Sequence, residues 1–176
     1  MKKALLIFLS IFLFTCNQEN SIQEGCFEGD CINGEGSFMY PDSMIYKGGW
    51  VDGKCNGNGT LTAFDSSFFY TGSFKDNLFN GHGTVFAPTW NYMGEFKNDR
   101  LHGLGILKWP DGPNKGAKFI GEFIEGSIYG KGMLMYPDST IATGVWKSFE
   151  LIEHIPTDSI TNFLLQNIPK DLILYF

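Results

Sequence analysis

The sequence has few positive charges and few histidines, and each shortage argues against a class of function. Lys and Arg together number 13 against 19 Asp and Glu, which gives a formal net charge of -6. Nucleic acids and anionic lipid headgroups attract basic surfaces, so this acidic chain is predicted to bind neither by charge. Three histidines and the absence of a C-x-x-C pair leave no ligand set for a metal, and we predict no cofactor.

Long apolar runs are also scarce, and the one at the amino terminus is too short to span a membrane. Residues 1–15 begin with Lys2 and Lys3 and continue with ALLIFLSIFLFT, which is typical of a signal peptide. Cys16 follows directly, and a polar tether completes 16–22. This arrangement resembles a bacterial lipoprotein signal. An ordinary signal peptide cut nearby is the alternative.

The lipoprotein resemblance implies that Cys16 carries fatty acyl chains such as palmitate, and several such chains would anchor the protein durably. Removing residues 1–15 takes away two lysines and no acid, so the net charge changes from -6 to -8. We therefore expect a protein of the bacterial cell envelope that is held to the membrane by its lipid. Asn17 does not decide between the inner and the outer membrane.

Glycine and aromatic residues are abundant, and they recur at fixed spacing. In the stretch YKGGWVDGKCNGNG at 46–59, counting its first residue as position 0, aromatics occupy positions 0 and 4 and glycines occupy positions 2, 11 and 13. Units in this register start at 23, 46, 70, 92 and 119, and a partial unit starts at 142. Self-similarity at such a period indicates a repeat array.

Each unit is predicted to form one β-hairpin. Asp52 and Gly53 supply a two-residue turn, which would pair position 4 with position 9 and position 2 with position 11. Position 9 is apolar throughout and is expected to face inward: Ile32, Cys55, Phe79, Leu101 and Ile128. The Asn-Gly steps at 33, 56 and 80 would then lie inside second strands, and the paired glycines would let rings at positions 0 and 4 lie against a neighbouring unit.

The string Y-x-G-x-W-x-x-G-x-x-x-G-x-G, intact from Tyr46 to Gly59, resembles the MORN (membrane occupation and recognition nexus) repeat. The resemblance covers about 23–147 and implies an all-β protein, an elongated, twisted antiparallel sheet built from consecutive hairpins. Because a lipid signal is joined directly to this repeat array, our leading hypothesis is a non-catalytic module that binds or scaffolds an unidentified protein or envelope component. Residues 148–176 are expected to cap the array on its open edge or on one face. A short helix is predicted near 158–168, with Thr157, Asp158 and Ser159 as candidate cap residues. The final segment DLILYF is predicted to be a strand or an apolar tail.

The candidate site residues are aromatic, acidic or sulfur-containing. Six rings form a stripe that either packs in the core or contacts a ligand such as a carbohydrate or lipid headgroup: Tyr46, Trp50, Tyr70, Phe74, Tyr92 and Phe96. A small hydrolase using Glu95 and Glu122 is a further alternative. Cys26 and Cys31 lie diagonally across the first hairpin, within reach of a disulfide if the local geometry relaxes. The long turn at 110–118 is either a partner contact or tolerated slack.

Overall fold

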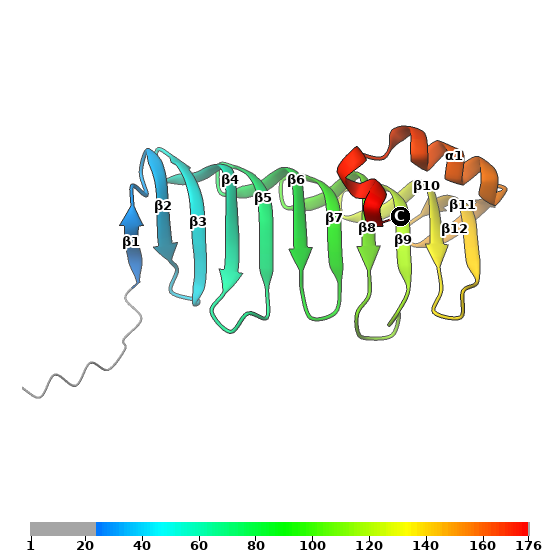
Figure 1. The fold of residues 1–176 in the computed structure, drawn as a ribbon, viewed down its shortest axis with the longest axis horizontal. Coiled ribbons are helices and arrows are strands. Elements are labelled where there is room, and N and C mark those ends of the chain that lie inside the picture. The colour runs from blue at the N-terminus through cyan, green and yellow to red at the C-terminus, as the bar shows by residue number, and fades with distance from the viewer. Residues whose placement is uncertain (1–23, 176) are drawn as a thin grey trace, which may run out of the picture.

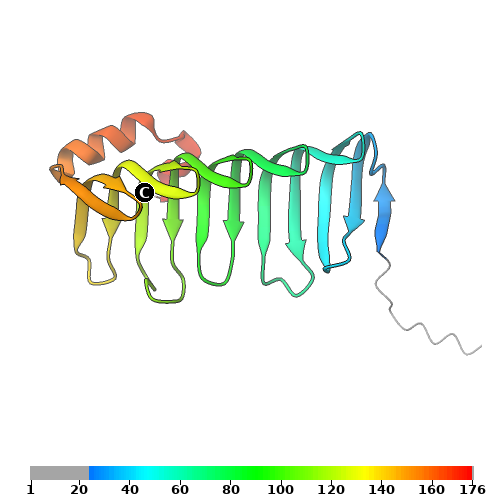
Figure 2. The same cartoon turned by 180° about the vertical axis from the view of Figure 1, so that it is seen from behind.

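The computed structural model describes residues 24–175. Twelve strands follow one another in a single antiparallel sheet whose spatial order is the order of the sequence. Figures 1 and 2 show the strands as a long row with the helical segments over the C-terminal half. This confirms the predicted elongated sheet of consecutive hairpins. The strands are β1 (Gly25–Gly29), β2 (Gly34–Met39), β3 (Met44–Val51), β4 (Lys54–Ala63), β5 (Phe69–Lys75), β6 (Leu78–Phe86), β7 (Asn91–Lys97), β8 (Arg100–Lys108), β9 (Lys118–Ile124), β10 (Ser127–Met135), β11 (Ile141–Lys147) and β12 (Glu150–His154).

The hairpin turns are the tight two-residue turns that the sequence predicts. Asp52 and Gly53 connect β3 to β4 and have φ values of 49° and 71°. Two successive residues with positive φ match the right-handed twist of the flanking strands, and Asp, Asn and Gly tolerate that conformation best. The equivalent turn residues Asp76, Asn77, Asn98 and Asp99 also have positive φ.

The register departs from the prediction within each hairpin. Trp50 pairs with Cys55 as expected, but Gly48 pairs with Gly59 rather than with Gly57, because β4 contains a bulge between these pairs. Gly57 lies in the bulge with φ of 77°, a conformation that glycine adopts without strain. Gly57 therefore forms the bulge, and Gly59 pairs with Gly48 of the opposite strand.

Glycines at positions 2 and 13 form one row across the sheet, and the position 0 rings lie over it. The side chain of Tyr46 covers Gly48 and Gly59 of its own hairpin, so the expectation that rings cover the glycines of a neighbouring unit is wrong for position 0. A Cβ on Gly59 would stand only 2.6 Å from the Tyr46 hydroxyl oxygen. The row contains Gly36, Gly48, Gly59, Gly72, Gly83, Gly94, Gly105, Gly121, Gly132 and Gly144.

The first hairpin differs from the others. β1 ends at Gly29 and β2 begins at Gly34, so the connection is a four-residue loop over 30–33 rather than a two-residue turn. Ile32 therefore projects from the loop with 63% of its surface exposed, and the prediction that it faces inward is wrong. The Asn33-Gly34 step lies at this loop, whereas the steps at 56 and 80 lie inside β4 and β6 as predicted.

The two faces of the sheet carry different cores. Rings at positions 0 and 4 fill one face from Tyr46 to Trp146. On the opposite face, Ile106, Ile120 and Met133 belong to one buried cluster with Ile160 and Leu164 of α1 (Thr157–Asn167). The helix confirms the predicted one, although Pro156 is its N-cap residue and no side chain caps it. No helix in the described part of the chain is long and apolar enough to cross a membrane.

The C-terminal segments cover a face of the sheet and leave its edge open. β12 adds a strand beyond Lys147, where the predicted repeat array stops, and among the strands of residues 24–175 it pairs only with β11. The expected strand or apolar tail is absent from 171–175, because Lys170–Tyr175 is the 3-10 helix η1. Its Leu172 is buried in the same cluster as α1. Of the two predicted ways of capping, the structure therefore has the face and not the edge.

Candidate binding surfaces

The six rings proposed as ligand contacts lie in the core instead. Tyr46, Trp50, Tyr70, Phe74, Tyr92 and Phe96 are each at most 6% exposed. From the unit at 70 onward, each position 4 ring meets the position 0 ring of the preceding unit at a steep angle, as Phe74 does with Tyr46 at 4.9 Å between centroids. Edge-to-face pairs of this kind stabilise the boundary between units. Burial leaves little of these ring surfaces for a carbohydrate or headgroup, and Tyr46, Trp50 and Phe74 reach solvent only as part of a groove lining.

The tyrosine hydroxyls of the stripe are satisfied by the backbone. Tyr46 donates to the carbonyl of Gly49 at 2.9 Å, Tyr70 to that of Ser73 at 2.8 Å and Tyr92 to that of Glu95 at 3.0 Å. Burial raises the pKa of all three phenols, because an ionised phenolate would lose its hydration. These residues are therefore neutral structural donors.

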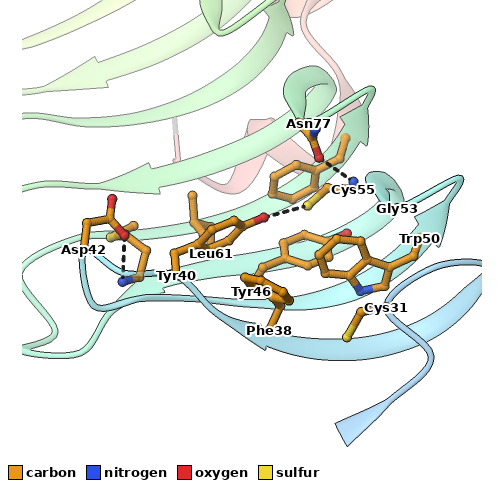
Figure 3. A pocket seen from close by; sticks show the side chains of 12 residues that line it. Cys31, Phe38, Tyr40, Asp42, Tyr46, Trp50, Gly53, Cys55, Leu61 and Asn77 are labelled. Atoms are coloured by element: carbon orange, nitrogen blue, oxygen red, sulfur yellow. Dashed lines mark hydrogen bonds between the residues drawn. The ribbon is translucent and has the colours of Figure 1, made fainter. Parts of the chain in front are cut away.

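A groove of about 460 Å³ opens on the aromatic face of the first two full hairpins (Figure 3). Tyr40 and Cys55 meet across it, with 3.4 Å between the hydroxyl oxygen and Sγ. The Cys55 backbone N–H donates to Oδ1 of Asn77 at 2.7 Å. Cys55 is 3% exposed, and burial raises the pKa of its thiol. The groove therefore presents a neutral thiol rather than a nucleophilic thiolate.

A second groove, of about 440 Å³, lies on the same side of the array near its C-terminal end. The long turn at 110–118 forms one wall and is held by its own backbone bonds, including Gly116 N–H to the carbonyl of Trp109 at 2.7 Å. Tyr136 and Phe149 line the groove and are 43% and 54% exposed. Tyr136 and Phe149 are thus rings outside the stripe that a partner can reach.

The charged residues considered for catalysis lie on the opposite face. Glu95 stands between His82 of β6 and His102 of β8 in the strand register. Glu122 of β9 accepts a hydrogen bond from the Lys131 backbone N–H of β10 at 2.6 Å, so its carboxylate helps to join these two strands. No group of three His, Cys, Asp or Glu in residues 24–175 is arranged to hold a metal ion.

The remaining predicted sites lie at the amino-terminal end. Cys26 and Cys31 form a disulfide in the structure, with their Cα atoms 6.0 Å apart. This bond ties β1 to the loop over 30–33. Cys16 lies outside the described residues.

The family to which the chain belongs is decided by the match of a family model to the repeats. The MORN repeat model matches residues 24–45, 46–67, 70–91, 92–113 and 119–141. The chain belongs to the MORN repeat family. No curated protein matches it. Membership in the family suggests a binding or scaffolding role, because MORN repeat proteins are generally non-catalytic binding modules.

Two features of this MORN array were not predicted from the sequence, although a sequence pattern indicates each of them. Tyr40, Trp109 and Tyr136 each precede a proline in a return turn, and each lines one of the grooves. The second is the apolar patch under α1, since position 14 changes from Thr60 and Thr84 in the second and third units to Ile106 and Met133 in the fourth and fifth. An outward strand position that turns apolar indicates a covered face.

Proposed function

We propose that this MORN protein is a non-catalytic, membrane-anchored binding or scaffolding module of a bacterial cell envelope. The observation that carries the proposal is the joining of five MORN repeats into one unbroken sheet. The stripe rings are buried in the core that holds this sheet together. What an array of this kind offers a partner is an extended surface.

The anchor is assigned to Cys16, and its spacing from the sheet limits where the array can lie. The chain makes eight residue-to-residue steps from Cys16 to Glu24, where the described structure begins. A fully extended chain spans about 3.5 Å per residue, so this tether reaches roughly 28 Å. The first strand would then lie within that distance of the membrane surface, and the far end of the sheet would lie about 50 Å further along the array, given strands spaced about 4.8 Å apart.

The acidic body supports attachment through lipid rather than through charge. A net charge of -8 after removal of 1–15 repels anionic headgroups. The array is therefore free to present its grooves and its edge to a partner in the envelope.

Metabolic labelling with a palmitate analogue, followed by membrane fractionation, tests the anchor. The full chain should take up label and sediment with membranes, and Cys16→Ala should lose both properties. Cys55→Ala is the matched control, because it removes a buried thiol from the sheet and should leave label and sedimentation unchanged. Equal labelling and sedimentation of Cys16→Ala would refute the anchor.

Crosslinking in intact cells, followed by mass spectrometry, tests the scaffolding role. A photoreactive residue placed at the exposed Tyr136 or Phe149 should capture a defined protein. The same residue at the buried Tyr70 should capture none. Recovery of no protein from any exposed position would count against scaffolding.

A further inference from the structure

The sheet ends in an exposed strand that the C-terminal segments do not cover. All five residues of β12 are exposed, and Ile152 is 59% exposed. α1 packs over β10 and β11 instead. An uncovered edge strand presents free backbone donors and acceptors to any chain that can pair with it.

Inside the array, backbone hydrogen bonds join each unit to the turn of the next hairpin. At each boundary, a backbone N–H of the next hairpin turn donates to the carbonyl at position 9 of the preceding unit. Examples are Gly53 to Ile32 at 3.0 Å and Asn77 to Cys55 at 3.1 Å. The Leu151 carbonyl is the next position in this series, at the end of the array.

Ion pairs reinforce two of the five boundaries. There the residue at position 8 is basic and pairs with an acidic turn residue of the next unit: Lys54 with Asp76 at 3.5 Å, and Arg100 with Glu125. At the other three boundaries position 8 is uncharged. In the last unit position 8 is Glu150, so the sign is reversed. Lys147 lies opposite Glu150 in the register, yet neither Glu150 nor Glu153 forms an ion pair within the described part of the chain.

Another copy of this chain is a poor occupant of the edge. The opposite end of the sheet is also acidic, with Glu24, Glu28 and Asp30 and no Lys or Arg over 24–31. Pairing β12 with a second β12 would likewise bring four glutamates into one seam. Like charges facing each other across strands are destabilising.

We propose that β12 binds an extended segment of a partner protein as a thirteenth strand, and that this segment carries Lys or Arg against Glu150 and Glu153. Apolar residues of the segment alternate with the basic ones and pack beside Leu151. The inference rests on the binding role proposed above and names where the partner docks and what chemistry it has. Main-chain hydrogen bonds supply affinity, and the two carboxylates select the partner.

A synthetic peptide of alternating Lys and Val tests the inference with purified full-length protein. We expect binding by fluorescence anisotropy together with slower amide hydrogen exchange in β12. The double variant E150K/E153K should bind about tenfold more weakly, because two attractive cross-strand pairs become repulsive. A peptide with Glu in place of Lys should instead prefer that variant.

The matched control is E24K/E35K, which changes the net charge equally at exposed positions near the other end of the sheet. It should leave binding and β12 protection nearly unchanged. Equal weakening by both double variants would show general attraction to an acidic protein and overturn the inference. Protection in the grooves rather than in β12 would overturn it too. Edge binding in solution with no partner captured in cells would refute the scaffolding proposal alone, whereas cellular crosslinks without edge binding would refute only this inference.

Discussion

Replacing Gly59 by alanine should destabilise the sheet because the new methyl group has no space. The added Cβ would lie 2.6 Å from the Tyr46 hydroxyl oxygen, 2.7 Å from Cε2 and 2.8 Å from Cζ. Such distances are shorter than van der Waals contact, so the ring must move. Tyr46 is fully buried, and its displacement also breaks the hydrogen bond to the Gly49 carbonyl.

The size of the effect follows from three contributions. Overpacking a filled core costs about 1–3 kcal/mol. Loss of the hydroxyl hydrogen bond costs about 1 kcal/mol. Alanine regains roughly 0.5–1 kcal/mol through its better backbone entropy in a strand. The free energy of unfolding of Gly59→Ala should therefore fall by about 1–3.5 kcal/mol.

Urea unfolding followed by circular dichroism measures this difference. Gly34→Ala is the matched control, because its nearest contact is the exposed Asp30 side chain at 3.1 Å. Combining Gly59→Ala with Tyr46→Leu tests the cause directly, since the smaller side chain leaves room for the methyl group. The added cost of Gly59→Ala should then nearly vanish. Equal unfolding free energies for Gly59→Ala and Gly34→Ala would refute the steric explanation.

Three further predictions concern the second face, the buried thiol and the first loop. Ile160→Ala should lower the free energy of unfolding by about 2–4 kcal/mol, with loss of helical circular dichroism, because it empties a buried site between α1 and the sheet. Cys55 should react with iodoacetamide at least tenfold more slowly in the native chain than in urea, since burial shields the thiol and raises its pKa. The backbone N–H groups of Asn33 and Ile32 donate to Asp30 and hold the pKa of its carboxyl below the usual value. The ionised carboxylate therefore stabilises the fold fully at pH values above the usual pKa. This stabilisation is lost as the pH falls through the lower pKa of the folded state. Asp30→Asn should accordingly flatten that part of the curve of unfolding free energy against pH, and an unchanged curve would contradict this assignment.

Much of the fold could be predicted because the repeat fixes local geometry several times over. The turn at Asp52 and Gly53 and the pairing of Trp50 with Cys55 follow from residue type and spacing alone. The bulge at Gly57 could not be predicted in the same way. Residue spacing predicts which residues would pair if both strands were regular. A bulge instead depends on one residue adopting positive φ while its neighbours keep their pairing.

The candidate surfaces were harder to predict than the strands. The stripe rings were identified as either packing or ligand contacts, and only their burial between adjacent units assigns them to the core. Exposed rings such as Tyr136 were overlooked because turn residues follow no strand alternation. Whether a turn side chain is exposed depends on the neighbouring turns beside it.

The sequence by itself determined the repeated hairpin, the order of the strands and the acidity of the chain, since these depend on composition and on contacts between near neighbours. Only the tertiary structure decided that α1 covers one face and leaves β12 uncovered. That choice depends on apolar residues of different units, Ile106, Ile120 and Met133, being brought together in one cluster with α1 and η1. Their assembly into a single patch is a property of the folded sheet, and so is the open acidic edge beside it.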